Sequence, residues 1–264
     1  MASTESNRIY ISLITRRKET LQMTNLVAVD NKNHLNTRVD LSKVEQHGAD
    51  LQLVPVVLSE FINLAVQYPI ILTKNDNTGQ FVFSAMLGFE KNENLFWQQE
   101  QWQGLYVPLQ VRRQPFFIES NNQQDNANQQ NNELTVCLNT ESPSLSNETG
   151  EALFDVNGQE STYFKTVKEN LSQLLMGEKE NNLLLKSLTS MELIQPISLD
   201  ITFVDQSATK LTGLYTIDQD KLGALTNEQI ITLYQAGLLP SIYTMITSLG
   251  QVHALIDLKN KRLN

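Results

Sequence analysis

The chain has 264 residues, of which 41% are hydrophobic and 19% are charged, and its formal net charge is −9. This composition is ordinary for a globular protein with a sizeable core, and it excludes disorder along the whole chain. Binding to a phosphate backbone needs clustered Lys and Arg, so the acidic balance argues against a nucleic-acid partner.

The N-terminal segment, residues 1–22, is predicted to be a loose extension. It holds a short apolar run at residues 9–14, followed by the basic residues 16–18, which is the reverse of the order in a secretory signal. The sequence contains no window of about 18 apolar residues, so we expect no membrane span. We expect one domain over residues 23–264.

The N-terminal half is predicted to form strands and hairpins. Residues 51–58 are a strand candidate, and Ser59 offers an N-cap for a short helix over residues 60–67. Two apolar runs, residues 70–73 and 80–89, flank a polar turn that contains glycine. This pattern is typical of a β-hairpin.

Residues 106–117 combine two prolines, an arginine pair and three aromatic residues. Each proline disfavours the α region at the residue before it, so this stretch is expected to be a short helical or extended rod. Arg112 and Arg113 are adjacent, so one guanidinium can point into the protein and the other into solvent. With Trp102 and Tyr106 they form our candidate surface for a protein partner or a small ligand. In the alternative interpretation these residues only tie the hairpin to the core.

An insert follows at residues 121–132, which are almost entirely Asn and Gln. Because it is so poor in apolar groups, we expect a disordered insert or loop. Further on, Glu148, Glu151 and Asp155 raise the possibility of a Ca²⁺ or Mg²⁺ site, since hard cations bind several oxygen ligands. Their spacing fits no known metal loop, so we predict a solvated acidic loop and no metal.

The C-terminal half is predicted to be mainly helical. Apolar positions recur at helical intervals over residues 164–175 and again over residues 184–191, which predicts two consecutive helices separated near Gly177. Residues 197–204 and 210–217 then alternate with period two around a polar turn, and this is the clearest hairpin in the chain.

Further helices are expected at the C-terminus. Asp218 is expected to cap a helix rather than bind a metal. Thr226 is expected to cap a helix that Gly237 ends, and an apolar stripe over residues 239–256 predicts one last amphipathic helix. We expect that stripe to pack in the core rather than on a membrane, because basic residues gather only at its end.

The single cysteine, Cys137, cannot form an internal disulfide, which indicates a reducing compartment and predicts a cytoplasmic protein. Cys137 lies in a strand-like run, and the three histidines form no recognisable arrangement with it, so we expect a buried structural thiol. No nucleotide-binding, zinc-protease or serine-hydrolase motif occurs. We therefore predict no cofactor and name no catalytic residue.

Several short segments together resemble the bacterial SapC family. They are Val-Pro-Val-Val at 54–57, Tyr-Pro-Ile at 68–70, Ala-Met-Leu-Gly-Phe-Glu at 85–90, Asn-Leu-Phe at 94–96, Tyr-Val-Pro at 106–108, Arg-Arg-Gln-Pro-Phe at 112–116, Gly-Glu-Ala-Leu-Phe-Asp at 150–155, Leu-Thr-Gly-Leu-Tyr at 211–215 and Ser-Leu-Gly at 248–250. The family name implies association with a bacterial surface layer, but the resemblance implies no catalytic residues. It also implies gene neighbours that encode TonB-dependent receptors, flavin-dependent halogenase-like proteins and cupin-like proteins, and hence an accessory role in the uptake or modification of a substrate.

These observations predict an α+β fold in which antiparallel hairpins pack with a helical C-terminal half. The leading functional hypothesis is a soluble, non-enzymatic binding or accessory protein. Two alternatives remain open. One is an enzyme whose site forms only in the folded chain. The other is a structural subunit of a surface-layer or envelope assembly, which predicts an apolar interface and self-association.

Overall fold

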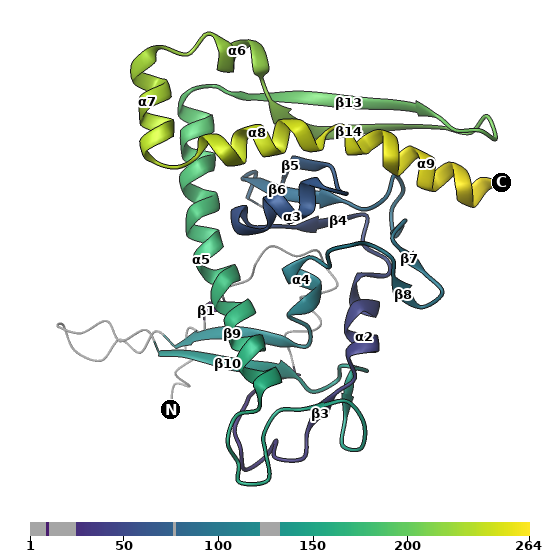
Figure 1. The fold of residues 1–264 in the computed structure, drawn as a ribbon, viewed down its shortest axis with the longest axis vertical. Helices are drawn as coiled ribbons and strands as arrows, with labels where there is room; N and C mark the ends of the chain where they lie inside the picture. Colours follow the sequence, from purple (N-terminus) through teal and green to yellow (C-terminus); the bar gives the residue numbers. More distant parts are fainter. Residues whose placement is uncertain (1–8, 11–24, 76–77, 122–132) are drawn as a thin grey trace, which may run out of the picture. The chain divides into compact units, whose positions relative to one another are not determined.

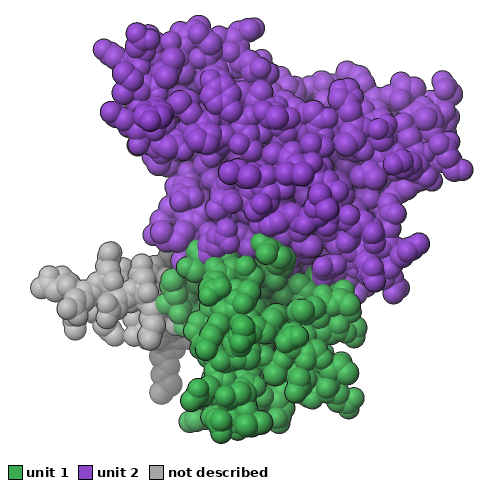
Figure 2. Space-filling model, viewed as in Figure 1, with its two compact units in different colours: residues 1–44, 112–172 green, residues 45–111, 173–264 purple. Residues whose placement is uncertain are grey.

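The structure is a computed structural model that describes residues 9–10, 25–75, 78–121 and 133–264. The chain divides into two compact units (Figure 2), each made of two separate stretches of sequence. Unit 1 contains residues 1–44 and 112–172, and unit 2 contains residues 45–111 and 173–264. The assignment of residues 23–264 to a single domain stays a prediction.

Two sequence predictions fall mostly outside the described residues. Of the expected N-terminal extension, residues 9–10 form strand β1 and the rest lies outside. Of the expected Asn/Gln insert, Asn121 ends strand β9 and residues 122–132 lie outside.

Unit 1 is built around a sheet with the strand order β1-β9-β10-β2, in which all neighbours are antiparallel. These strands are β1 (Ile9–Tyr10), β9 (Phe116–Asn121), β10 (Glu133–Asn139) and β2 (Leu26–Ala28). A smaller sheet joins β11 (Leu145–Ser146), β3 (Arg38–Val39) and β12 (Glu151–Ala152), and helix α2 (Leu41–Glu45) follows β3. Phe116, Leu138 and Phe164 are among the residues of its apolar core.

Unit 2 is built around a larger antiparallel sheet with the order β13-β14-β5-β6-β4 (Figure 1). Its strands are β13 (Ile194–Thr202), β14 (Ala208–Ile217), β5 (Ile70–Lys74), β6 (Phe81–Met86) and β4 (Leu53–Pro55). β5 pairs with β6, and β13 pairs with β14, both antiparallel. Both predicted hairpins are therefore confirmed, and the α+β fold class with them.

The remaining elements of unit 2 are short helices, a small hairpin and the C-terminal helices. They are η2 (Gln46–Gly48), η3 (Leu58–Glu60), α3 (Phe61–Ala65), β7 (Trp97–Gln98), β8 (Gln101–Trp102), α6 (Gln219–Gly223), α7 (Asn227–Gln235), α8 (Leu239–Ser248) and α9 (Gln251–Leu263). Helix α3 packs against α8, and both pack on β5. Phe61, Tyr68 and Phe83 are among the largest fully buried side chains of the core.

The prediction of two helices around Gly177 is wrong. Helix α5 (Thr162–Ser190) is continuous through that residue (Figure 1). A Cβ atom at position 177 would lie 2.5 Å from the Cβ atom of Val57. The glycine therefore leaves room for the Val57 side chain against the backbone of α5 and does not end the helix.

The single C-terminal helix predicted from the apolar stripe is also wrong, because α8 ends at Ser248 and α9 begins at Gln251. The buried Ser248 hydroxyl accepts a hydrogen bond from the backbone N–H of Ile70 at 2.9 Å and donates to the carbonyl of Met245 at 2.6 Å. The end of α8 is thus fixed to β5, while Leu249 and Gly250 keep right-handed helical dihedrals in the short break before α9.

The predicted N-cap at Ser59 is wrong as well. Helix η3 begins at Leu58 with Val57 as its N-cap, and the Glu60 carboxylate accepts a hydrogen bond from the Val57 N–H at 3.2 Å. By contrast, the predicted caps at Asp218 and Thr226 are confirmed, since each side chain accepts a backbone N–H of the helix that follows it.

Candidate functional site

Trp102 of β8 is a buried core residue of unit 2. Its indole N–H donates to the Tyr68 hydroxyl at 3.0 Å. Two glycines leave room for the ring: a Cβ atom on Gly48 would lie 2.6 Å from Cζ3 of Trp102, and one on Gly104 would lie 2.5 Å from Nε1. The indole is therefore enclosed by close backbone contacts that any larger residue would disturb.

Tyr106 belongs to a hydrogen-bonded chain that starts at Trp102. The Tyr68 hydroxyl donates to the Tyr106 carbonyl at 2.7 Å, and the Tyr106 hydroxyl donates to Glu60 Oε1 at 3.1 Å. The buried Glu60 carboxylate also accepts the N–H of Leu109 at 2.7 Å. Burial raises the pKa of Tyr68 well above its usual range, although the hydrogen bond from Trp102 opposes the shift. The chain therefore joins neutral hydroxyl groups to one carboxylate that several donors satisfy.

Sequence reasoning missed Tyr68 and Glu60. Glu60 accepts the N–H of Val57 three residues before it, as the acid of a capping box does, but valine lacks the side-chain acceptor that would make this a sequence signal. No local pattern pointed to Tyr68, because its partners Trp102 and Tyr106 follow it by more than thirty residues.

The two arginines lie in unit 1, at and just after the end of helix α4 (Leu109–Arg112). Arg113 is buried, its guanidinium donates to the Phe116 carbonyl at 3.0 Å, and its Cζ lies 4.3 Å from the centre of the Phe117 ring. Arg112 is half-buried. Trp102 and Tyr106 belong to unit 2. Binding of a partner or ligand by these four residues stays a prediction.

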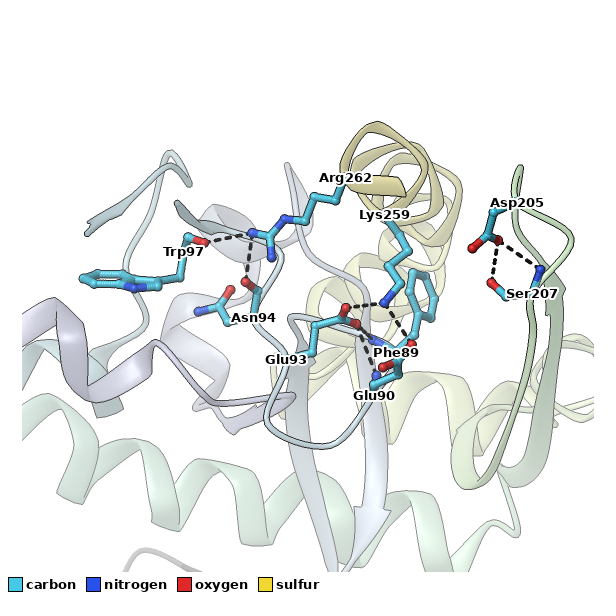
Figure 3. Close-up of polar contacts among 9 residues, drawn as sticks. All are labelled: Phe89, Glu90, Glu93, Asn94, Trp97, Asp205, Ser207, Lys259 and Arg262. Carbon is cyan, nitrogen blue, oxygen red and sulfur yellow. Dashed lines mark hydrogen bonds and ion pairs between the residues drawn. The ribbon is translucent and has the colours of Figure 1, made fainter. Parts of the chain in front are cut away.

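A charged cluster holds the C-terminal helix α9 (Figure 3). The ammonium group of Lys259 lies 2.9 Å from Glu90 Oε1 and 2.5 Å from Glu93 Oε1, and its side chain is only 10% exposed. Burial by itself lowers the pKa of Lys259, but hydrogen bonds and charge from Glu93 and Glu90 outweigh it, so the pKa lies above its usual value. Lys259 is therefore a stable cation that joins α9 to the loop after β6.

A second basic residue of α9 binds backbone oxygen in the same region (Figure 3). The Arg262 guanidinium donates to the carbonyls of Asn94 and Trp97 at 3.1 and 2.8 Å. Glu93 also accepts the N–H of Phe89 at 2.8 Å, which fixes the loop itself. We therefore assign this cluster to anchoring α9 and the loop over residues 88–97.

Helix α7 has an unusual distribution of apolar side chains. It buries Leu233 but leaves Ile230, Ile231 and Tyr234 exposed, with Tyr234 at 73%. Residues 230 and 234, and likewise 231 and 234, are one turn apart and share a helix face. We call these three exposed side chains the α7 face.

Both ends of helix α7, which carries the α7 face, are capped. The Thr226 side chain accepts the N–H of Gln229 while the Gln229 side chain accepts the N–H of Thr226, which completes a capping box. After the helix, Gly237 adopts a positive φ of 69°, and the N–H of Leu238 donates to the carbonyl of Leu233. Gly237 confirms the predicted helix end.

The predicted acidic loop contains a hydrogen-bonded turn at Asp155. Asp155 Oδ1 accepts the N–H groups of Asn157 and Gln159, at 2.8 and 2.9 Å, within a turn. Over residues 9–10, 25–75, 78–121 and 133–264, no group of three or more His, Cys, Asp or Glu side chains is placed to hold a metal ion.

Cys137 lies in β10 and is buried, as predicted.

No single helix of the described chain is long and apolar enough to cross a membrane. Helix α7 and the α8–α9 segment meet the length and composition criteria only as a pair, and the two are bent by 95°.

Comparison with known proteins identifies the family. No curated protein and no solved structure matches the chain. The SapC family model matches residues 29–255. The chain therefore belongs to the SapC family.

Proposed function

We propose that this SapC family protein is a non-catalytic accessory protein that binds another protein, and that the α7 face is its contact. The observation that carries the proposal is the exposure of Ile230, Ile231 and Tyr234 on a helix that buries only Leu233. Apolar groups gathered on one exposed face mark sites of interaction, and tyrosine is enriched in protein interfaces.

The geometry of α7 suits insertion into an apolar groove of a partner. Helices that bind in this way present anchors at intervals of three and four residues, as Tyr234 does with Ile231 and Ile230. The capping box at Thr226 and the turn at Gly237 hold the helix before any partner arrives. Little ordering entropy is then lost on binding, which favours affinity.

Two finer expectations belong to the same proposal. The resemblance of the sequence to the family suggests a role beside TonB-dependent receptors and flavin-dependent halogenase-like enzymes, in the uptake or modification of a substrate. The lone Cys137 suggests a cytoplasmic location. The products of neighbouring genes are therefore the first candidate partners.

The test compares binding of purified gene-neighbour products by three immobilised proteins. These are the wild type, an Ile231→Asp/Tyr234→Asp variant, and a Val156→Asp control at a site of unit 1 that is 94% exposed. We expect the α7 variant to weaken binding of a partner about tenfold or more, while the control binds as the wild type does. Equal binding by all three proteins would show that the α7 face is not the contact.

An Arg112→Ala/Arg113→Ala variant tests the surface predicted from the sequence in the same assay. Because Arg113 is buried and bonded to the Phe116 carbonyl, circular dichroism must first show that this variant is folded. Loss of partner binding by a folded arginine variant, with binding retained by the α7 variant, would favour the surface predicted from the sequence.

A further inference from the structure

The turn over residues 155–159 of unit 1 carries the one Asn-Gly pair in the sequence, Asn157 and Gly158. Asn157 and its neighbour Val156 are exposed. Gly158 adopts a positive φ of 75°, which favours glycine over other residues. A Cβ atom at position 158 would also lie only 3.3 Å from Nδ2 of Asn31. The turn therefore favours glycine directly after an exposed asparagine.

Hydrogen bonds hold this turn closed. Asp155 Oδ1 accepts the N–H groups of Asn157 and Gln159, at 2.8 and 2.9 Å. The N–H of Gly158 donates to the Asp155 carbonyl at 2.9 Å. The Asn31 side chain donates to the Gly158 carbonyl at 3.0 Å. The Gly158 nitrogen is therefore held in place while the turn is closed, and it can change partner only when the turn opens.

Asparagine is a thermolabile residue, and glycine after it removes the steric hindrance that a Cβ atom gives. We propose that Asn157 is a site of spontaneous deamidation, and that the turn over residues 155–159 sets its rate. The Gly158 nitrogen loses its proton and forms a bond to Cγ of Asn157, while the bond from Cγ to Nδ2 breaks. Nδ2 leaves as ammonia with the proton that Gly158 gives up, and a five-membered succinimide remains.

Water opens the succinimide and completes the reaction. Addition of water at Cγ gives an aspartate at position 157. Addition at the backbone carbonyl gives an isoaspartate, in which the main chain passes through Cβ and Cγ. The net reaction consumes one water and releases one ammonia, so it needs no oxidant, metal or cofactor. Both products carry a new carboxylate.

Both products disturb the contacts of the turn. The new carboxylate adds a negative charge close to that of Asp155, in a chain whose net charge is already −9. Isoaspartate also lengthens the main chain by one atom, which displaces the Gly158 carbonyl from the Asn31 side chain. The reaction therefore loosens the turn and makes the protein more acidic. It takes place in unit 1 and is independent of the α7 face in unit 2.

The experiment incubates the folded full chain at mildly alkaline pH, digests it, and measures isoaspartate and a mass gain of about 1 Da in the peptide that contains Asn157. A synthetic peptide of residues 152–162 gives the rate without the fold. We expect the full chain to react about tenfold more slowly than the peptide, because the turn must open first. Asn227, an exposed asparagine followed by glutamate, is the matched control and should stay unchanged.

Two variants test the site and the turn separately. Asn157→Ser should abolish the new acidic species. Asp155→Ala removes the acceptor of two N–H groups, so the reaction should be about fivefold faster or more. If circular dichroism shows that this variant is unfolded, Asn31→Ala replaces it. No mass gain at Asn157 after the synthetic peptide has converted, or an equal rate at Asn227, would overturn the inference. An unchanged rate in folded Asp155→Ala would overturn the control by the turn.

Discussion

Gly177 of α5 lies directly against Val57, the residue that precedes helix η3. A Cβ atom added at position 177 would lie 2.5 Å from the Cβ of Val57 and less than 3.0 Å from both of its methyl groups. Beside this contact, the Asn181 side chain accepts the N–H of Leu58 at 3.0 Å and donates to the Val56 carbonyl at 2.9 Å. One turn of α5 therefore binds the 56–58 segment through both shape and hydrogen bonds.

The Gly177→Ala substitution should destabilise the protein, although alanine is the better helix former. We expect a loss of about 1–3 kcal/mol in the free energy of unfolding, because the buried Val57 cannot move aside without strain. Gly223→Ala is the control, since a Cβ atom there would meet open space. Urea unfolding gives both values, and a stabilised Gly177→Ala variant would contradict the close contact.

The Tyr68→Phe substitution should cost about 1–3 kcal/mol of unfolding free energy, because it leaves the buried indole N–H of Trp102 without its acceptor. It also removes the donor to the Tyr106 carbonyl. Tyr234→Phe, at a mostly exposed tyrosine, should change stability by less than about 0.5 kcal/mol. If denaturant titrations gave the same change in unfolding free energy for Tyr68→Phe and Tyr234→Phe, the hydrogen-bonded chain would contribute nothing to stability.

The Lys259→Met substitution should cost about 1.5–3 kcal/mol of unfolding free energy, because charge-assisted hydrogen bonds to Glu90 and Glu93 are lost at a largely buried site. The control is Lys210→Met. Lys210 pairs with Asp200 while both side chains are 64% exposed, so a change within about 0.5 kcal/mol is expected. A similar loss in both variants would contradict the anchoring role of Lys259.

The contribution of Lys259 should also depend on pH. Its pKa is raised in the folded protein, so the stabilisation is fully present below the unfolded pKa, about 10.4, and is lost as the pH rises through the folded pKa. Lys259 stays protonated from neutral pH to about pH 10, so its contribution to the difference in unfolding free energy between wild type and Lys259→Met should be constant over that range. Above about pH 10 this difference should shrink. Unfolding titrations from pH 8 to about pH 11 measure that difference. A stability difference that grows above about pH 10 would contradict a raised pKa of Lys259 in the folded protein.

Cys137 should be unreactive in the native protein. Its thiol is buried in β10, with Sγ at 3.5 Å from Glu119 Oε2, so a thiol reagent must wait for local or global opening. We expect labelling to be about 100-fold slower, or slower still, than in the urea-unfolded chain. Labelling of the native protein at the unfolded rate would contradict the burial.

Local chemistry in the sequence was enough to predict part of this fold. The hairpins over β5–β6 and β13–β14 follow from alternating apolar residues around polar turns. The ends of α7 follow from Thr226 and Gly237, whose effects act within a few residues. The order of short motifs likewise indicated the SapC family, which the family model matches over residues 29–255.

Features that depend on distant segments were decided by the tertiary structure. Glycine ends α7 at Gly237, but α5 continues through Gly177, and only the contact with the distant Val57 shows what the second glycine does. The hydrogen-bonded chain from Trp102 to Glu60 likewise joins residues that are far apart in the sequence, so no local pattern could predict that they lie close together.

The exposed faces required the tertiary structure for the same reason. The sequence by itself determined which segments are apolar and which carry no charge, because these are properties of composition. Whether Ile62 or Ile231 is buried depends on which other elements cover it, and that is set by packing between residues far apart in the chain. Periodicity therefore predicted the helices, while packing decided which of their apolar side chains remain exposed.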